Sequence, residues 1–183
     1  MIITISGRAG AGKSTMAMLL AKKLNLAHYS TGDFMRNMAK ERGVSLLELS
    51  RIAERNKSID KELDRWQVEL GKKHDNFVID GRLSGFFIPN SIKIFLDAEK
   101  KERARRILKD KRKEETSDSI AGMMKELHKR ELSEIKRYKE YYGFNCYKKK
   151  YYDIVIDSTK SSKQETLRKI INRIKSFMSE PKR

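Results

Sequence analysis

The stretch GRAGAGKST, residues 7–15, follows the apolar run MIITIS. It meets the spacing G-x-x-x-x-G-K-[ST] with Gly7, Gly12, Lys13 and Ser14. In this pattern, backbone N–H groups of the loop and of the following helix surround a phosphate group. The pattern is informative when a strand precedes it and a helix follows it, and the flanking segments suit both. This order of strand, loop and helix favours an α/β fold.

Five short segments rich in apolar residues alternate with helical patterns along the chain. These candidate strands are residues 2–6, 27–30, 76–80, 92–97 and 152–157. All but the second are mostly continuous apolar runs, so we expect them to be buried on both faces of a parallel sheet. The capping pair Ser45 and Glu48 predicts one helix start. An apolar stripe predicts a long helix over residues 120–142 that ends at Gly143.

We expect a single domain over residues 1–183, because the sequence has no internal repeat or Pro/Gly-rich linker. Residues 31–75 hold two or three helical patterns and no strand. We interpret them as a helical insertion above the carboxyl ends of the strands, the edge at which ligands bind in open sheets. Residues 109–118, KDKRKEETSD, have no apolar side chain. They are interpreted as a short mobile flap between two helices.

The charge of the chain is strongly positive, with 42 Lys and Arg against 25 Asp and Glu and a net charge of +17. Such a surplus attracts nucleic acid, anionic lipid or phosphorylated small molecules. No apolar run approaches the roughly 18 residues of a membrane span, and no signal-peptide pattern is present. The single cysteine, Cys146, fits a reducing compartment. We therefore expect a cytoplasmic protein without a membrane partner.

The phosphate-binding loop predicts a nucleoside triphosphate with Mg²⁺. Lys13 is suited to neutralise charge on the β- and γ-phosphate oxygens, and the Ser14 hydroxyl is suited to ligate the metal. The candidate residues for binding ATP are Gly7, Gly10, Ala11, Gly12, Lys13, Ser14 and Thr15.

Polar residues also follow the second and third candidate strands. STGDFMR places Thr31, Asp33 and Arg36 after the second strand. An ordinary helix cap with a surface arginine is the alternative interpretation. VIDGR places Asp80 and Arg82 after the third strand, where the carboxylate is suited to hold Mg²⁺ through water. Simple turn chemistry is the alternative there.

Arg130, Glu134 and Arg137 are spaced i, i+4, i+7, so they share one face of the long helix. A solvent-exposed ladder of ion pairs is the default interpretation of such spacing. Transfer between two phosphorylated molecules, however, requires several cations around the phosphates. Besides Lys13, the candidates are Arg36, Arg82, Arg130 and Arg137, with Arg103 and Arg106 beside the flap.

The ordered set GRAGAGKST, HYSTGDFMR, IDKELDRWQVELGKK, VIDGRLSG and KRYKEYYG resembles the nucleoside monophosphate kinases, most closely the archaeal type of cytidylate kinase. The resemblance covers almost the whole chain. It implies a three-layer αβα fold of the P-loop NTPase type, with a five-stranded parallel sheet. It further implies a helical monophosphate-binding insertion and a lid. The implied reaction transfers the γ-phosphate of ATP to CMP or dCMP with Mg²⁺.

The resemblance also implies roles for single residues. Arg36 and Arg82 match the arginines that bind the acceptor phosphate, and Arg106 lies at the base of the lid. Arg130 and Arg137 match the pair that follows the lid. Glu134 is similar to an acidic residue that contacts the acceptor sugar.

Some residues depart from the family pattern and leave alternatives open. Trp66 stands where an arginine is expected, and STGD is typical of adenylate kinases. AMP, UMP or another small phosphorylated metabolite is therefore an alternative acceptor. A basic ATP-binding protein that acts on RNA is the other alternative, because residues 138–152 mix tyrosines with lysines. Nucleic acid is expected to bind only non-specifically, and we expect a monomer.

Overall fold

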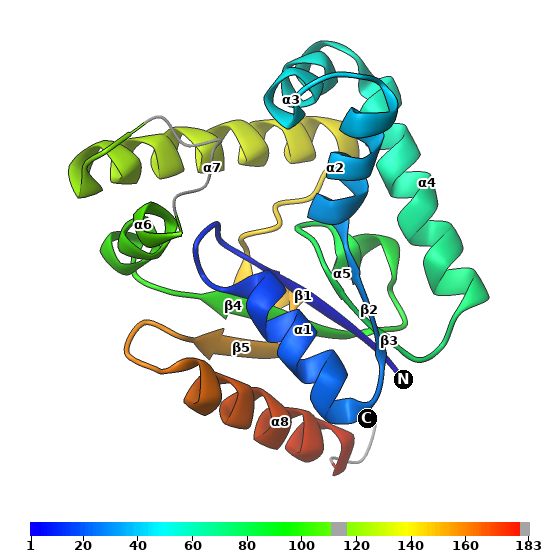
Figure 1. Ribbon diagram of the computed structural model, residues 1–183. Coiled ribbons are helices and arrows are strands. Elements are labelled where there is room, and N and C mark those ends of the chain that lie inside the picture. Colours follow the sequence, from blue (N-terminus) through cyan, green and yellow to red (C-terminus); the bar gives the residue numbers. More distant parts are fainter. Residues whose placement is uncertain (111–116, 180–183) are drawn as a thin grey trace.

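The computed structural model describes residues 1–110 and 117–179 (Figure 1). Its centre is a five-stranded sheet in the order β2-β3-β1-β4-β5, and every pair of neighbouring strands is parallel. The strands are β1 (Ile2–Gly7), β2 (Ala27–Ser30), β3 (Phe77–Asp80), β4 (Ile92–Asp97) and β5 (Ile154–Asp157). The predicted parallel α/β fold is confirmed, with each strand within two residues of its expected limits.

Helices connect the strands and cover the sheet. They are α1 (Lys13–Leu24), α2 (Thr31–Glu41), α3 (Leu46–Arg55), α4 (Lys57–Lys73), α5 (Ser84–Phe87), α6 (Lys100–Lys109), α7 (Ile120–Tyr142), the 3₁₀ turn η1 (Lys149–Tyr151) and α8 (Lys163–Ser179). The Ser45 hydroxyl accepts a hydrogen bond from the backbone N–H of Glu48, as its capping role requires. Helix α7 ends at Gly143, which has φ +64°, a conformation that favours glycine.

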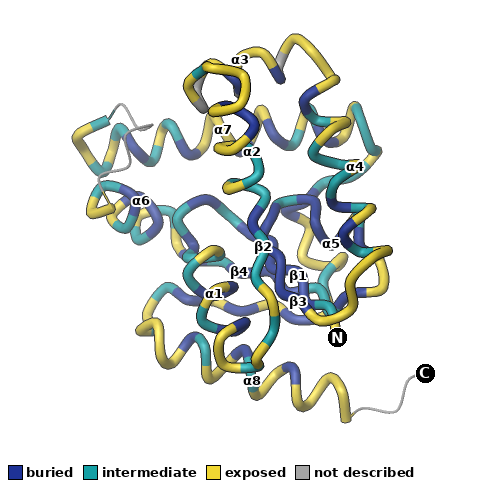
Figure 2. The backbone as a smooth tube through the Cα atoms, turned by 45° about the vertical axis from the view of Figure 1, so that its right-hand side comes forward, coloured by how far each residue is buried: buried dark blue, intermediate teal, exposed yellow. Residues whose placement is uncertain are grey.

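The alternation of side chains along the strands builds a core on each face of the sheet. Ile3 and Ile5 of β1 face α1 and α8, with Leu20 and Ile170 among the residues that cover them. Phe77 and Ile79 of β3 face the other way and pack with Leu70 of α4. Phe95 of β4 packs on that side with Tyr138 of α7 and with Cys146 and Tyr147. Dark blue segments in Figure 2 follow these inner strands. The result is three layers.

One strand differs from the prediction of burial on both faces. Ile154 and Ile156 of β5 are buried, whereas Val155 and Asp157 are exposed. The strand order explains the difference, because β5 lies at the edge of the sheet and packs against α8 on one face. The local sequence could not reveal this position.

The carboxyl ends of the strands lie at one edge of the sheet. Helix α2 begins there immediately after β2, and α3 and α4 follow before β3. Helices α6 and α7 pack against each other beside the same edge, with Ala104 and Ile107 against Met123 and Leu127. Residues 111–116 of the predicted flap lie outside the described residues.

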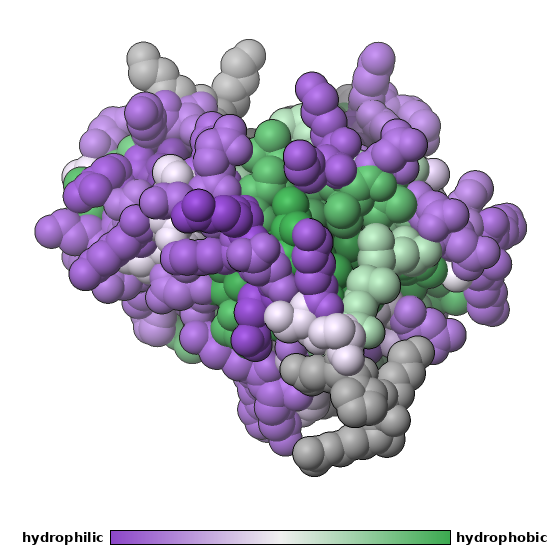
Figure 3. All heavy atoms as spheres, turned by 90° about the horizontal axis from the view of Figure 1, so that it is seen from below, coloured by the Kyte–Doolittle hydropathy of each residue, from purple (hydrophilic) through white to green (hydrophobic). Residues whose placement is uncertain are grey.

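One face of the molecule is mainly polar. Viewed from below, hydrophilic side chains surround a hydrophobic area (Figure 3). No helix in the described part of the chain is long and apolar enough to cross a membrane.

Candidate active site

The glycine-rich loop turns directly from β1 into α1. At Gly7, φ is +141°, and a Cβ atom would lie 2.0 Å from the Leu96 carbonyl oxygen on the neighbouring strand. At Gly10, φ is +79°, and a Cβ would lie 2.6 Å from the Arg103 carbonyl oxygen. Both positions therefore require glycine. Helix α1 begins at Lys13, so its first N–H groups point toward the loop.

Lys13 lies at the centre of the positive charge around this loop. Its Nζ donates a hydrogen bond to the Arg8 carbonyl oxygen at 3.0 Å. Burial, followed by the positive charge of Arg82, lowers the pKa of Lys13 from 10.5 to about 7. Arg82 is therefore close enough to Lys13 for their charges to repel. An anion bound between them would relieve this repulsion.

Asp80 joins the loop to the ends of β2 and β3. Its Oδ2 atom accepts hydrogen bonds from the Ser14 hydroxyl at 2.7 Å and the Ser30 hydroxyl at 3.3 Å. Its Oδ1 atom lies 2.9 Å from His28 Nε2. The Thr31 hydroxyl donates to the backbone oxygen of Asp80 at 3.2 Å. The structure thus brings Ser14, Thr31 and Asp80 together, and it adds His28, which sequence analysis did not single out.

A second cluster surrounds Glu134 on α7. Arg82 Nε lies 2.6 Å from Glu134 Oε2, and Arg130 Nε lies 3.2 Å from Glu134 Oε1. Burial alone would raise the pKa of Glu134, but the two guanidinium groups outweigh it and hold this pKa below its usual value. Glu134 is therefore an ionised carboxylate held between two arginines near Lys13.

Arg137 shares the helix but has a different partner. Its Nη1 atom lies 3.9 Å from Asp60 Oδ2 on α4, and its guanidinium lies over the Tyr138 ring at 5.1 Å. One turn along α4, Asp64 accepts a hydrogen bond from the Tyr142 hydroxyl at 2.6 Å. Burial raises the pKa of Asp64 to about 6. Neither aspartate was predicted as a site residue, although their i, i+4 spacing in IDKELD was available as a signal.

Two of the predicted arginines have other surroundings. Arg36 pairs with Asp33 at 2.5 Å, and both residues are exposed near the start of α2. Arg106 donates to the Ser158 hydroxyl at 3.0 Å and to its carbonyl oxygen at 2.7 Å. The Ser158 hydroxyl also donates to the Ala11 carbonyl oxygen of the phosphate-binding loop, residues 7–15, which we call the donor loop. Arg106 therefore lies beside this loop.

Arg103 has the contacts of a structural residue. It is 2% exposed and donates to the carbonyl oxygens of Ala98 and Ala9 at 2.9 and 3.2 Å. Its Nη1 atom also lies 2.7 Å from Glu131 Oε1. The suggestion that Arg103 supplies a cation to the phosphates therefore has no support in these contacts, since carbonyl groups and Glu131 already surround it.

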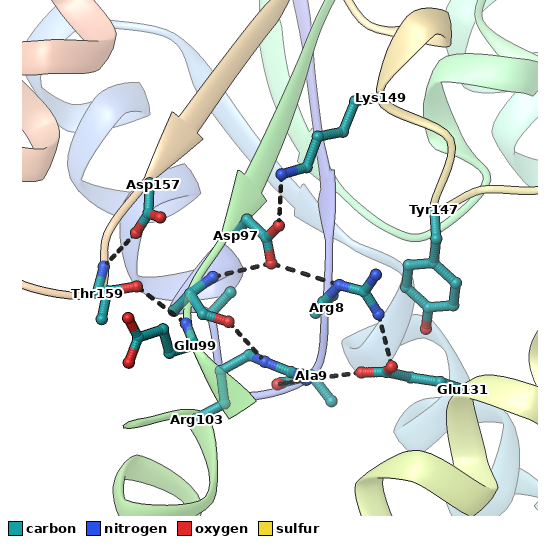
Figure 4. Close-up of polar contacts among 12 residues, drawn as sticks. Arg8, Ala9, Asp97, Glu99, Arg103, Glu131, Tyr147, Lys149, Asp157 and Thr159 are labelled. Carbon is teal, nitrogen blue, oxygen red and sulfur yellow. Dashed lines mark hydrogen bonds and ion pairs between the residues drawn. The ribbon is translucent and has the colours of Figure 1, made fainter. Parts of the chain in front are cut away.

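A polar network on the other side of the loop was also missed (Figure 4). Arg8, the second residue of the loop pattern, lies 2.5 Å from Glu131 Oε2 and 3.4 Å from Asp97 Oδ1. Lys149 also pairs with Asp97, at 2.9 Å. These partners are distant in the sequence and follow no common spacing, so no local signal was available to find them.

Comparisons of the sequence with known proteins indicate one family. A model of the Cytidylate kinase-like family matches residues 2–160. The cytidylate kinase of Methanobrevibacter smithii is 40% identical over 93% of this chain and 96% of its own length. That of Methanocaldococcus jannaschii is 43% identical over 87% of this chain and 89% of its own length.

Solved structures share the fold at lower sequence identity. An uncharacterised protein from Eubacterium ventriosum is 21% identical, with a TM-score of 0.67 over 96% of this chain and 99% of its own. Shikimate kinase from Acinetobacter baumannii is 16% identical, with a TM-score of 0.65 over 98% of this chain and 95% of its own. The predicted three-layer P-loop kinase fold is thereby confirmed.

Proposed function

The chain belongs to the Cytidylate kinase-like family, and on this premise we propose that it transfers the γ-phosphate of ATP to CMP or dCMP, forming CDP or dCDP. One observation carries the proposal beyond family membership: Lys13 of the donor loop lies beside Arg82, which is paired with Glu134 on α7. A loop for the donor triphosphate and a cationic site for a second anion therefore adjoin. Transfer of a phosphoryl group between two anions requires this arrangement.

The proposed roles follow from charge and position. Lys13 stabilises charge on the β- and γ-phosphate oxygens, while Arg36 and Arg82 bind the phosphate of the monophosphate. Arg130 and Arg137 stabilise the γ-phosphoryl group as it passes in line, and such a transfer needs no covalent intermediate. The remaining acceptor contacts are assigned to Thr31, Asp33, Asp80 and Glu134. Arg106, from its contacts, is suited to support the donor loop.

The residues around Asp80 fit a magnesium ion. Ser14 Oγ and Asp80 Oδ2 lie 2.7 Å apart at the mouth of the loop. Mg²⁺ prefers such hard oxygen ligands, usually one or two from the protein together with water and substrate phosphates. We propose that Ser14 and Asp80 hold Mg²⁺, which would neutralise phosphate charge when ATP is bound.

Residues 31–75 are proposed to enclose the monophosphate and residues 109–118 to act as a lid. Closure over the site would exclude water, because the same geometry is able to transfer the phosphoryl group to water. The single-domain organisation, the monomeric state and the cytoplasmic location remain predictions.

The first experiment compares acceptors. With ATP and Mg²⁺, we expect diphosphate formation from CMP and dCMP to exceed that from UMP and AMP. Preference for AMP would keep the phosphotransfer chemistry and change the acceptor. Failure to phosphorylate any of the four, together with binding of RNA, would contradict the proposal.

A variant of Arg82 tests whether this residue binds the monophosphate and not ATP. Arg82→Ala is expected to raise KM for CMP at least tenfold, since a charge-assisted contact to phosphate is lost. KM for ATP should change less than about twofold. Arg105→Ala is the matched control, because Arg105 is exposed on α6 and pairs with Glu102 of the same helix. Equal increases of both KM values in Arg82→Ala would overturn its assignment to the acceptor.

A further inference from the structure

Tyr147 lies in the connection from α7 to β5, beside Arg8 of the donor loop (Figure 4). Its hydroxyl group contacts Glu134. Tyr147 is 8% exposed, and it packs with Leu83 and Phe95 in the core of that face. Neither the loop pattern nor the helical spacing drew attention to it. Its two ends, however, contact two different parts of the site.

The hydroxyl group of Tyr147 contacts the acceptor side. It donates a hydrogen bond to Glu134 Oε2, the oxygen that also lies 2.6 Å from Arg82 Nε. Burial raises the pKa of Tyr147, so the phenol remains protonated and acts as a donor at neutral pH. This donor fixes one carboxylate oxygen beside Arg82, and it leaves Oε1 directed toward Arg130 at 3.2 Å.

The ring of Tyr147 contacts the donor side. The guanidinium carbon of Arg8 lies 4.8 Å from the ring centroid, within the range of a cation–π contact. Arg8 belongs to the loop itself, and its pairs with Asp97 and Glu131 hold the guanidinium at this place. The Tyr147 side chain thus supports the donor loop and also orients the Glu134 carboxylate.

We infer that Tyr147 is a positioning residue that fixes the place of the Glu134 cluster (Glu134, Arg82 and Arg130) relative to the donor loop. It does so through its hydroxyl group, which contacts Glu134, and through its ring, which contacts Arg8. This inference rests on the proposed function for its kinetic consequences. The alternative is that Tyr147 only fills the core, in which case its hydroxyl has no separate effect on the two substrates.

Two substitutions separate the two contacts. Tyr147→Phe keeps the ring and removes the hydroxyl, so KM for CMP should rise about tenfold while KM for ATP changes less than about twofold. Tyr147→Leu also removes the ring, so KM for ATP should rise as well. Tyr152→Phe is the matched control, because the Tyr152 hydroxyl donates to the Cys146 carbonyl oxygen at 2.6 Å in the same region. We expect it to leave both KM values unchanged.

A structural role alone would give a different result. Unchanged KM values in Tyr147→Phe, or equal increases for CMP and ATP, would overturn the inference. A substrate-independent measurement accompanies the kinetics: a double-mutant cycle of Tyr147→Phe and Glu134→Gln, read by urea unfolding. Coupling between the two changes is expected, and additive effects would refute the contact. If the wild-type protein did not phosphorylate CMP, the proposed function would fail, while the cycle would still decide whether Tyr147 holds Glu134.

Discussion

Among single residues, Lys13 gives the clearest prediction of how stability depends on pH. Its pKa is lowered from 10.5 to about 7 by burial and by Arg82. Between about pH 7 and pH 10.5, Lys13 is protonated in the unfolded chain and deprotonated in the folded protein. The free energy of unfolding should therefore rise with pH from about 7 to 10.5, since the unfolded state binds more protons.

Lys13→Met tests this effect together with catalysis. The variant should be more stable than the wild type at pH 7, because a buried charge is removed, and the difference should disappear toward pH 10.5. Its kcat should fall at least 100-fold, as expected when a donor to the developing phosphate charge is lost. Urea unfolding at several pH values and steady-state kinetics measure the two effects. Lys22→Met, on the exposed side of α1, is the control.

A substitution of the single residue Asp80 tests the proposed Mg²⁺ site. Asp80→Asn keeps the size of the side chain and removes the charge, so the Mg²⁺ concentration for half-maximal activity should rise about tenfold. Chelation of Mg²⁺ should abolish the activity of the wild type. Asp75→Asn serves for comparison, because Asp75 is exposed just before β3, at the opposite end of the sheet. An unchanged Mg²⁺ requirement in Asp80→Asn would remove this residue from the metal site.

Single residues differ in how far the sequence could predict their place. Lys13 and Ser14 lie within one short motif, and Asp80 ends an apolar strand, so local patterns placed all three. Tyr147 carries no such pattern. It reaches Glu134 and Arg8 only because α7 and the following connection return across the sheet.

At the scale of elements, capping residues and apolar stripes predicted most helices and strands, since these signals act within a few residues. The order of strands in the sheet is not local, and for that reason the half-exposed face of β5 was not predicted. Contacts between elements were likewise missed. Arg103 on α6 and Glu131 on α7 show this best, because 28 residues separate them and both are buried.

The Arg103–Glu131 pair joins α6 and α7 to the donor loop, through the Ala9 carbonyl oxygen. Arg103→Met should lower the free energy of unfolding by about 3 kcal/mol, because breaking a buried ion pair leaves polar groups without partners. Glu131 would keep Arg8 as a partner, which limits the loss. Urea unfolding measures this change. Arg105→Met, on the exposed face of the same helix, should cost less than about 0.5 kcal/mol. Similar losses in both variants would contradict the structural role of Arg103.

At the scale of the whole molecule, the net charge of +17 acts on all anions. It should draw ATP and CMP to the site and also bind RNA without sequence preference. Raising salt from 50 to about 500 mM should therefore increase both KM values, through screening of the long-range attraction.

RNA binding distinguishes the kinase from the alternative of a basic ATP-binding protein that acts on RNA. We expect a labelled single-stranded oligonucleotide to bind at low salt and to be released by about 200 mM salt, because counterion release dominates non-specific affinity. Fluorescence anisotropy measures the binding, and turnover of CMP is followed in the same buffers. Turnover that persists where RNA no longer binds supports a nucleotide kinase with a basic surface. Tight RNA binding at 300 mM salt with negligible turnover would instead assign the tyrosines and lysines of residues 138–152 to an RNA partner.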